Sequence, residues 1–161
     1  MTLEPNPSVS PAGAVITPGW SDAAIFVAER TEESRRQLQS SSAVGLGVVF
    51  NELCQVAEEC ESANWDGYGA EPVSIDTYRF AYRFLEALPV GTPPPSVGAE
   101  PDGDLTFEWH RGSERTLSVS VSPEGELHFS ARIGIARDYG TRAFLGEVPR
   151  RIFELIQRVV A

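Results

Sequence analysis

The stretch from Leu105 to Arg132, LTFEWHRGSERTLSVSVSPEGELHFSAR, alternates apolar and polar residues in three runs. Successive side chains of a β-strand point to opposite faces of a sheet, so this period of two predicts three strands that share one apolar face. The segments Arg111-Gly112-Ser113 and Ser122-Pro123-Glu124-Gly125, which separate the runs, predict hairpin turns. The strands should therefore form an antiparallel meander with one dry face and one wet face.

The segments on either side of the three runs extend this architecture. A fourth strand is expected from Ser96 to Ala99, and it leads into the meander through a turn at Pro101-Asp102-Gly103. The segment from Ile135 to Gly146 has no regular period and is expected to be irregular. A final helix should start near Pro149, because proline is favoured at the first helical position. Its apolar positions are Val148, Ile152, Leu155, Ile156 and Val159.

Helical periods precede the strands. Apolar residues at three- and four-residue steps, from Leu46 to Cys60, predict a helix from about Gly47 to Ser62. Ser74 is a good N-cap for a second helix, which Pro89 ends. A further helix start is indicated at Trp20-Ser21-Asp22. The order predicts an α+β fold with two or three N-terminal helices, an antiparallel three- to four-stranded meander, and a C-terminal helix packed on one sheet face.

Composition divides the chain into three parts. Residues 1–19 are rich in Pro, Ser and Gly and are expected to form a flexible N-terminal arm. Residues 20–44 are expected to form a polar helix or linker. Residues 45–161 are expected to form a single globular α+β domain, a size that suits one hydrophobic core.

A connection of nine residues, from Asn64 to Pro72, joins the two upstream helices. Its glycines allow backbone angles that other residues avoid, and its Trp and Tyr are costly to leave in water. We expect a shaped turn with Trp65 largely buried and with both aromatic side chains between the helices. Asp66 is expected to accept backbone hydrogen bonds within the turn, with a ligand-binding role for Asp66 and Tyr68 as the alternative. The structural positions of this motif are Asn64, Trp65, Gly67, Gly69 and Pro72.

This connection also carries a resemblance. The chain resembles a group of small, uncharacterised bacterial proteins with an N-W-D-G-Y-G-A-x-P turn, followed by a β-meander and a C-terminal helix. The matching pieces are Asn64 to Pro72, Leu88-Pro89, Asp104 to Trp109, Leu117 to Leu127, Gly140 to Phe144, and Pro149 to Ile156. The resemblance implies a place in mobile or defence-type loci and an antitoxin-like or immunity-like role. In the group, an acidic residue follows the threonine that matches Thr141, whereas this chain has Arg142 at that position. The resemblance therefore implies no role for an acidic residue there.

The net charge of the chain indicates which class of partner it can bind. Acidic residues outnumber basic ones by 23 to 13, for a net charge of -10. This balance disfavours nucleic acids and anionic membranes, both of which require clustered positive charge. It favours another protein, of basic character, as the partner. Every basic residue is arginine, so lysine chemistry is excluded.

Several features predict a cytoplasmic protein without a cofactor. No apolar run approaches the roughly 20 residues of a membrane-spanning helix. The N-terminal residues do not follow the pattern of a secretory signal. Cys54 and Cys60 fall in one predicted helix about 240° apart around its axis, so they are expected to be two separate thiols that share neither a disulfide nor a metal ion.

The wet face of the meander offers the remaining candidate residues. Glu108, Ser118 and His128 outline a nucleophile, a base and an orienting group, which makes a hydrolase one alternative function. Serines that alternate along a strand are also typical of a solvated face, and no G-x-S-x-G turn accompanies them. We therefore predict no catalytic residue and no metal ligand. The candidate binding residues are Asp66, Tyr68, Glu108, His110, His128, Glu58, Glu59 and Glu61.

Three functions follow from these observations. The first is a non-catalytic protein-binding protein that acts on a bacterial partner, with Glu29 to Glu33 and the three glutamates at 58, 59 and 61 attracting it. The second is a hydrolase that uses Glu108, Ser118 and His128. The third is a structural subunit of a bacterial or phage assembly. The sequence leaves the partner and the oligomeric state open.

Overall fold

The alternating residues form the centre of an antiparallel sheet in a computed structural model that describes residues 44–161. The sheet has five strands in the order β1-β2-β3-β4-β5. Within residues 44–161, two helices precede it and one follows it. The elements are α2 (Val44–Glu59), α3 (Ile75–Glu86), β1 (Ser96–Ala99), β2 (Leu105–His110), β3 (Arg115–Val121), β4 (Glu126–Ile133), β5 (Ala136–Ala143) and α4 (Arg150–Val160). The predicted arm, residues 1–19, and residues 20–43 of the predicted linker lie outside the described residues.

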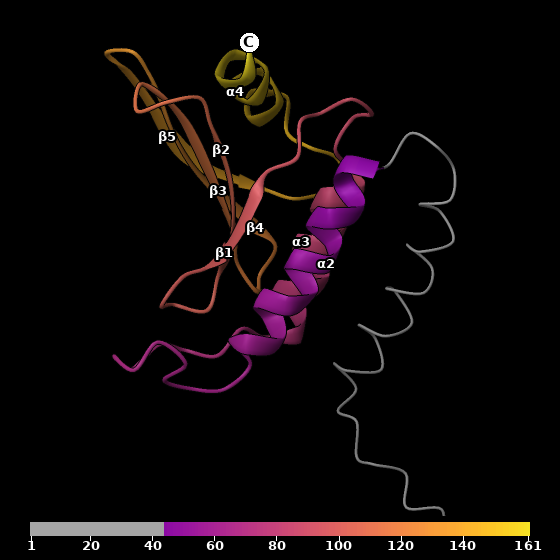
Figure 1. Cartoon of the computed structure of the whole chain (residues 1–161), viewed down its shortest axis with the longest axis vertical. Helices are drawn as coiled ribbons and strands as arrows, with labels where there is room; N and C mark the ends of the chain where they lie inside the picture. The colour runs from indigo at the N-terminus through magenta and orange to yellow at the C-terminus, as the bar shows by residue number, and fades with distance from the viewer. Residues whose placement is uncertain (1–43) are drawn as a thin grey trace, which may run out of the picture.

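All three described helices lie on one side of the sheet, which leaves its other face uncovered by them (Figure 1). The apolar positions of β2, β3 and β4 face these helices and are buried, as the alternation predicted. Trp109 is 2% exposed, and its Nε1–H donates to the Pro93 carbonyl at 2.8 Å. The α+β class is confirmed. Within residues 44–161, no helix has the length and apolar composition needed to cross a membrane.

The two upstream helices follow their predicted patterns. The predicted stripe of α2 packs on the core, although the helix ends at Glu59 rather than at Ser62. Ser74 caps α3, because its Oγ accepts the Thr77 N–H at 3.0 Å. The predicted positions on α3 are buried. These are Tyr78, Ala81, Tyr82 and Leu85, and Leu88, which follows the end of the helix, is buried too.

The prediction of an irregular segment from Ile135 to Gly146 was wrong, because β5 spans Ala136–Ala143 and makes the sheet five-stranded rather than three- to four-stranded. Its positions on the helix side are Asp138, Gly140 and Arg142, opposite Ala131, Phe129 and Leu127 of β4. Asp138 forms an ion pair with Arg151 of α4, and Arg142 lies over the Phe129 ring. Polar contacts replace apolar burial on this strand, so it has no hydrophobic alternation.

The two edges of the sheet differ. At β1, the Val97 N–H donates to the Glu52 side chain of α2 at 3.2 Å, so a helix closes part of this edge. At β5, the Thr141 carbonyl accepts a hydrogen bond of 2.7 Å from the guanidinium of the neighbouring Arg142. Such groups hinder the addition of a further strand to an edge.

Candidate functional site

The connection between α2 and α3 is a rigid turn closed by its own side chains. Asn64 has a φ of 62°, its N–H donates to the Ala70 carbonyl at 2.7 Å, and its Oδ1 accepts the Gly69 N–H at 2.7 Å. Asp66 Oδ1 accepts the N–H groups of Tyr68, at 2.7 Å, and of Ala70, at 3.1 Å. These bonds, led by the one from Tyr68, lower the pKa of Asp66. Asp66 therefore holds the turn together, as its structural interpretation predicted.

The two aromatic residues of the turn have different surroundings. Trp65 is half-buried against the core, and its Nε1–H donates to the Glu71 carbonyl at 2.9 Å. Tyr68 is 95% exposed, so the expectation that both aromatics lie between the helices was wrong for Tyr68. Tyr68 stands between Gly67 and Gly69, whose φ angles are 78° and 96°. This left-handed turn directs the tyrosine away from the protein.

The turn packs against the β1–β2 hairpin. The Glu71 N–H donates to the Pro101 carbonyl at 2.8 Å. At Gly103, whose φ is 88°, a Cβ atom would lie only 2.9 Å from the Pro72 carbonyl oxygen. This close approach requires glycine, and it fixes the position of Pro72 and of the turn relative to the sheet.

Carboxylates from several segments gather at this end of the molecule. The end of α2, the connection, the β1–β2 turn and the β3–β4 turn meet here because the strands are antiparallel and in sequential order. We call the set the acidic end. Its exposed members are Glu58, Glu59, Glu61, Glu71, Asp102, Glu124 and Glu126.

The pKa of Asp104 is affected by the neighbouring negative charges. Its side chain is 7% exposed. Burial, followed by the repulsion of Asp102 and smaller effects of Glu100 and Glu124, raises the pKa of Asp104 to about 6, against a lowering effect of His128. Carboxylates of two different turns therefore lie within electrostatic reach of one another.

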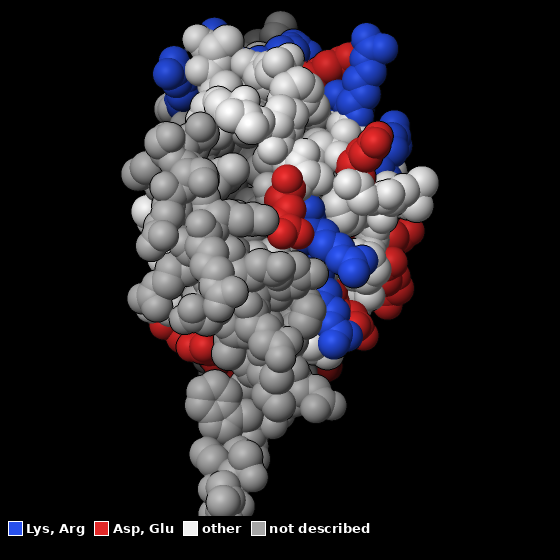
Figure 2. All heavy atoms as spheres, turned by 90° about the vertical axis from the view of Figure 1, so that its right-hand side faces the viewer, with Lys and Arg blue, Asp and Glu red and all other residues white. Residues whose placement is uncertain are grey.

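The arginines gather at the opposite end. The β2–β3 and β4–β5 turns and the last turn of α4 all lie there. Figure 2 shows several of the arginine side chains at the top of the molecule. Glu114 at this end is paired with Arg132 at 2.9 Å. The arginine end comprises Arg111, Arg115, Arg132, Arg137 and Arg158, all exposed.

The polar residues on the uncovered sheet face do not form the triad that the alternative hydrolase function would require. Glu108 and Ser118 lie directly opposite each other, but His128 lies in the next row, opposite Ser120. The His128 Nδ1 shares a hydrogen bond of 2.8 Å with Thr141 Oγ1, and its Nε2 lies 3.9 Å from Glu126. In the described part of the chain, no hydrogen bond joins Ser118 to His128. His110 is exposed at the far end of β2.

Sequence patterns missed two features of these surfaces. Glu100 accepts hydrogen bonds from both Thr106 and Ser120, which ties the β1–β2 turn to the uncovered face. The acidic end also includes Glu71, Asp102, Glu124 and Glu126, which only the strand order brings together with the predicted glutamates. Acidic residues in alternate hairpin turns were the available signal, since those turns meet at one edge of a meander.

No metal site accompanies these carboxylates: within residues 44–161, no three His, Cys, Asp or Glu side chains are placed to hold a metal ion. Cys54 and Cys60 form no disulfide within the described residues, and the Cys54 thiol donates to Glu58 Oε1 at 3.5 Å. Comparisons with protein-family models, curated proteins and solved structures find no match to the chain. The acidic end, with Tyr68 projecting from its rigid turn, is the candidate functional site.

Proposed function

We propose that the protein is a non-catalytic, cytoplasmic protein-binding protein that holds a basic bacterial partner through the acidic end, in an antitoxin-like or immunity-like role. The carrying observation is Tyr68, which is 95% exposed on a turn fixed by side-chain and backbone hydrogen bonds. Tyrosine is enriched at protein interfaces, because it offers a large contact area with little conformational entropy to lose.

The charges around this tyrosine support a basic partner. The carboxylates of the acidic end lie on the last turn of α2, on the segment that follows it, on the β1–β2 turn that packs against the connection, and on the β3–β4 turn. Exposed charges of one sign speed the encounter with a partner of opposite charge. An aromatic side chain that becomes buried in the interface when the complex forms slows dissociation. The carboxylates of the acidic end should therefore raise the association rate, and Tyr68 should lower the dissociation rate.

The test starts with affinity purification of full-length wild type and variants from the native host. Tyr68→Ser should lose the partner, while the control Tyr139→Ser, at a tyrosine of β5 that is 81% exposed, should retain it. A partner lost from Tyr139→Ser and kept by Tyr68→Ser would place the interface on the sheet instead and end this proposal.

Binding kinetics with the purified partner then separate the two contributions. Tyr68→Ser should raise the dissociation rate. The combined change of Glu58, Glu59 and Glu61 to Gln should lower the association rate and its dependence on salt, since exposed charges are screened over about 8–10 Å. An association rate that is indifferent to both salt and these substitutions would refute attraction by the acidic end.

A further inference from the structure

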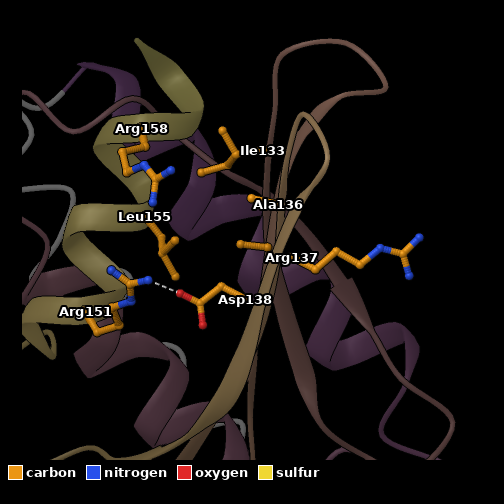
Figure 3. Close-up of a pocket in the computed structure, with 8 residues that line it drawn as sticks. Ile133, Ala136, Arg137, Asp138, Arg151, Leu155 and Arg158 are labelled. Atoms are coloured by element: carbon orange, nitrogen blue, oxygen red, sulfur yellow. Dashed lines mark hydrogen bonds and ion pairs between the residues drawn. The ribbon is translucent and has the colours of Figure 1, made fainter.

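A pocket of about 310 Å³ lies between α4 and the β4–β5 hairpin, away from the acidic end (Figure 3). Its apolar lining comes from Ala131, Ile133, Ala136 and Leu155. Leu155 and Ala131 are buried beneath the surface, so the apolar side chains of the pocket that solvent reaches are Ile133 and Ala136. The volume is at the lower end of the range for small-ligand sites, which is roughly 300–1,000 Å³.

Two arginines of α4 border this apolar lining. Arg151 and Arg158 are seven residues apart, so they lie two turns apart on the same side of the helix. Figure 3 shows both side chains beside Leu155, whereas Arg137 points away from the pocket. The pocket therefore combines an apolar wall with two guanidinium groups in a protein whose net charge is -10.

The two guanidinium groups differ in their bonding. Arg151 pairs with Asp138 of β5 and lies 3.5 Å from Glu154 Oε2. Within residues 44–161, Arg158 makes no hydrogen bond or ion pair. A guanidinium has five N–H donors in a planar fork that matches a carboxylate. Arg158 is thus available to an anion, and Arg151 retains donors beyond those used by its partners.

We propose that this pocket binds a carboxylate with a branched apolar body, with the carboxylate on Arg158 and Arg151 and the body against Ile133 and Ala136. A monovalent carboxylate fits better than a phosphate, because Asp138 and Glu154 already offset part of the positive charge. Two sources share this chemistry: a small aliphatic acid, and the last residue of a polypeptide with a free C-terminus.

Each arginine also has a structural role that requires no ligand. Arg158 lies in the last turn of α4, where a cation stabilises the helix dipole. Arg151 ties α4 to β5 through Asp138. If these were their only roles, Arg158→Gln would lower thermal stability without changing the binding of any acid.

The test titrates the full-length protein with 4-methylpentanoate and with a short peptide that ends in leucine, by NMR and calorimetry. Saturable binding of at least one acid is expected, with resonances of Ile133 and Ala136 shifting. The neutral 4-methylpentanamide and the C-terminally amidated peptide should not bind. Binding of the small acid alone, or tighter binding of the peptide, identifies the source. Absence of saturable binding by both acids, or equal binding of the amides, would overturn the proposal.

Three variants locate the contact. Arg158→Gln should weaken binding about tenfold or more, the usual loss for a charged hydrogen bond. Arg83→Gln removes the same charge at an exposed side chain of α3 that does not line the pocket, so its affinity should equal that of wild type. Asp138→Asn should strengthen binding several-fold, because it releases Arg151. Equal losses in Arg158→Gln and Arg83→Gln, or an affinity not raised in Asp138→Asn, would contradict this placement.

Discussion

Trp65 and Tyr68 are three residues apart in one turn and have opposite roles. Trp65 contacts the core and donates to the Glu71 carbonyl, so it joins the turn to the domain. Tyr68 is 95% exposed and contributes little to folding. The fold and the proposed interface thus depend on different side chains of the same short segment.

Trp65→Ala should lower the free energy of unfolding by about 3 kcal/mol, near the lower end of the range for large aromatic truncations because Trp65 is half-buried. Trp65→Phe should lower it by about 1 kcal/mol, mainly through the lost hydrogen bond. Chemical denaturation measures both, with Tyr68→Ala as the control, which should stay within about 0.5 kcal/mol of wild type. A loss below about 1 kcal/mol in Trp65→Ala would mean that the indole does not anchor the turn.

The buried carboxyl of Asp104 makes stability depend on pH. Its pKa of about 6 in the folded protein exceeds the ordinary value of 3.8 for an aspartic acid side chain. Between these two values the folded state binds more protons than the unfolded state, so stability falls as the pH rises through about 4 to 6 and stays lower above this window.

Asp104→Asn should therefore raise the free energy of unfolding at pH 7.5 by about 2–3 kcal/mol and give no gain below pH of about 4. Denaturation curves across this pH range provide the measurement. Glu86→Gln, at an exposed carboxylate of α3, is the control and should leave the pH profile unchanged. A gain in Asp104→Asn that is the same at every pH would exclude titration of Asp104 as its cause.

At the scale of elements, close approaches between turns hold the acidic end in shape. Gly103→Ala would place a Cβ atom 2.9 Å from the Pro72 carbonyl oxygen, in addition to the strain of a positive φ. Gly112 has a positive φ of 71° but open space around it. We expect a loss of about 3 kcal/mol for Gly103→Ala and about 1 kcal/mol for Gly112→Ala, where only the strain of a left-handed residue applies. Equal losses in denaturation experiments would show that the hairpin and the connection do not constrain each other.

Elements with a regular apolar period were predictable, since burial imposes that period on the sequence. The strands from Leu105 to Ala131 and the stripes of α2 and α3 follow this rule. β5 was not predictable in this way, because its side chains on the helix side are held by an ion pair and by stacking on Phe129. Gly140 is a further reason why β5 has no apolar alternation. It has no side chain, and this leaves room for the Phe129 ring.

At the scale of the whole molecule, the distribution of charge could not be predicted from individual segments. Three carboxylates were expected at exposed positions and are exposed, namely Glu58, Glu59 and Glu61. Their association with the two hairpin turns requires the strand order and the packing of Glu71 on Pro101. The outward direction of Tyr68 similarly depends on two glycine angles, which sequence patterns do not fix.

Both ends of the described chain lie on the side of the molecule opposite Tyr68. Gly45, at the start of α2, lies beside Pro94, and the Ala161 carbonyl accepts a hydrogen bond of 3.5 Å from Arg111. A label, a solid support or a fused protein attached at Ala161 would therefore leave the acidic end pointing into solution. A sensor chip prepared through this terminus would display every copy in the same orientation, with Tyr68 outermost.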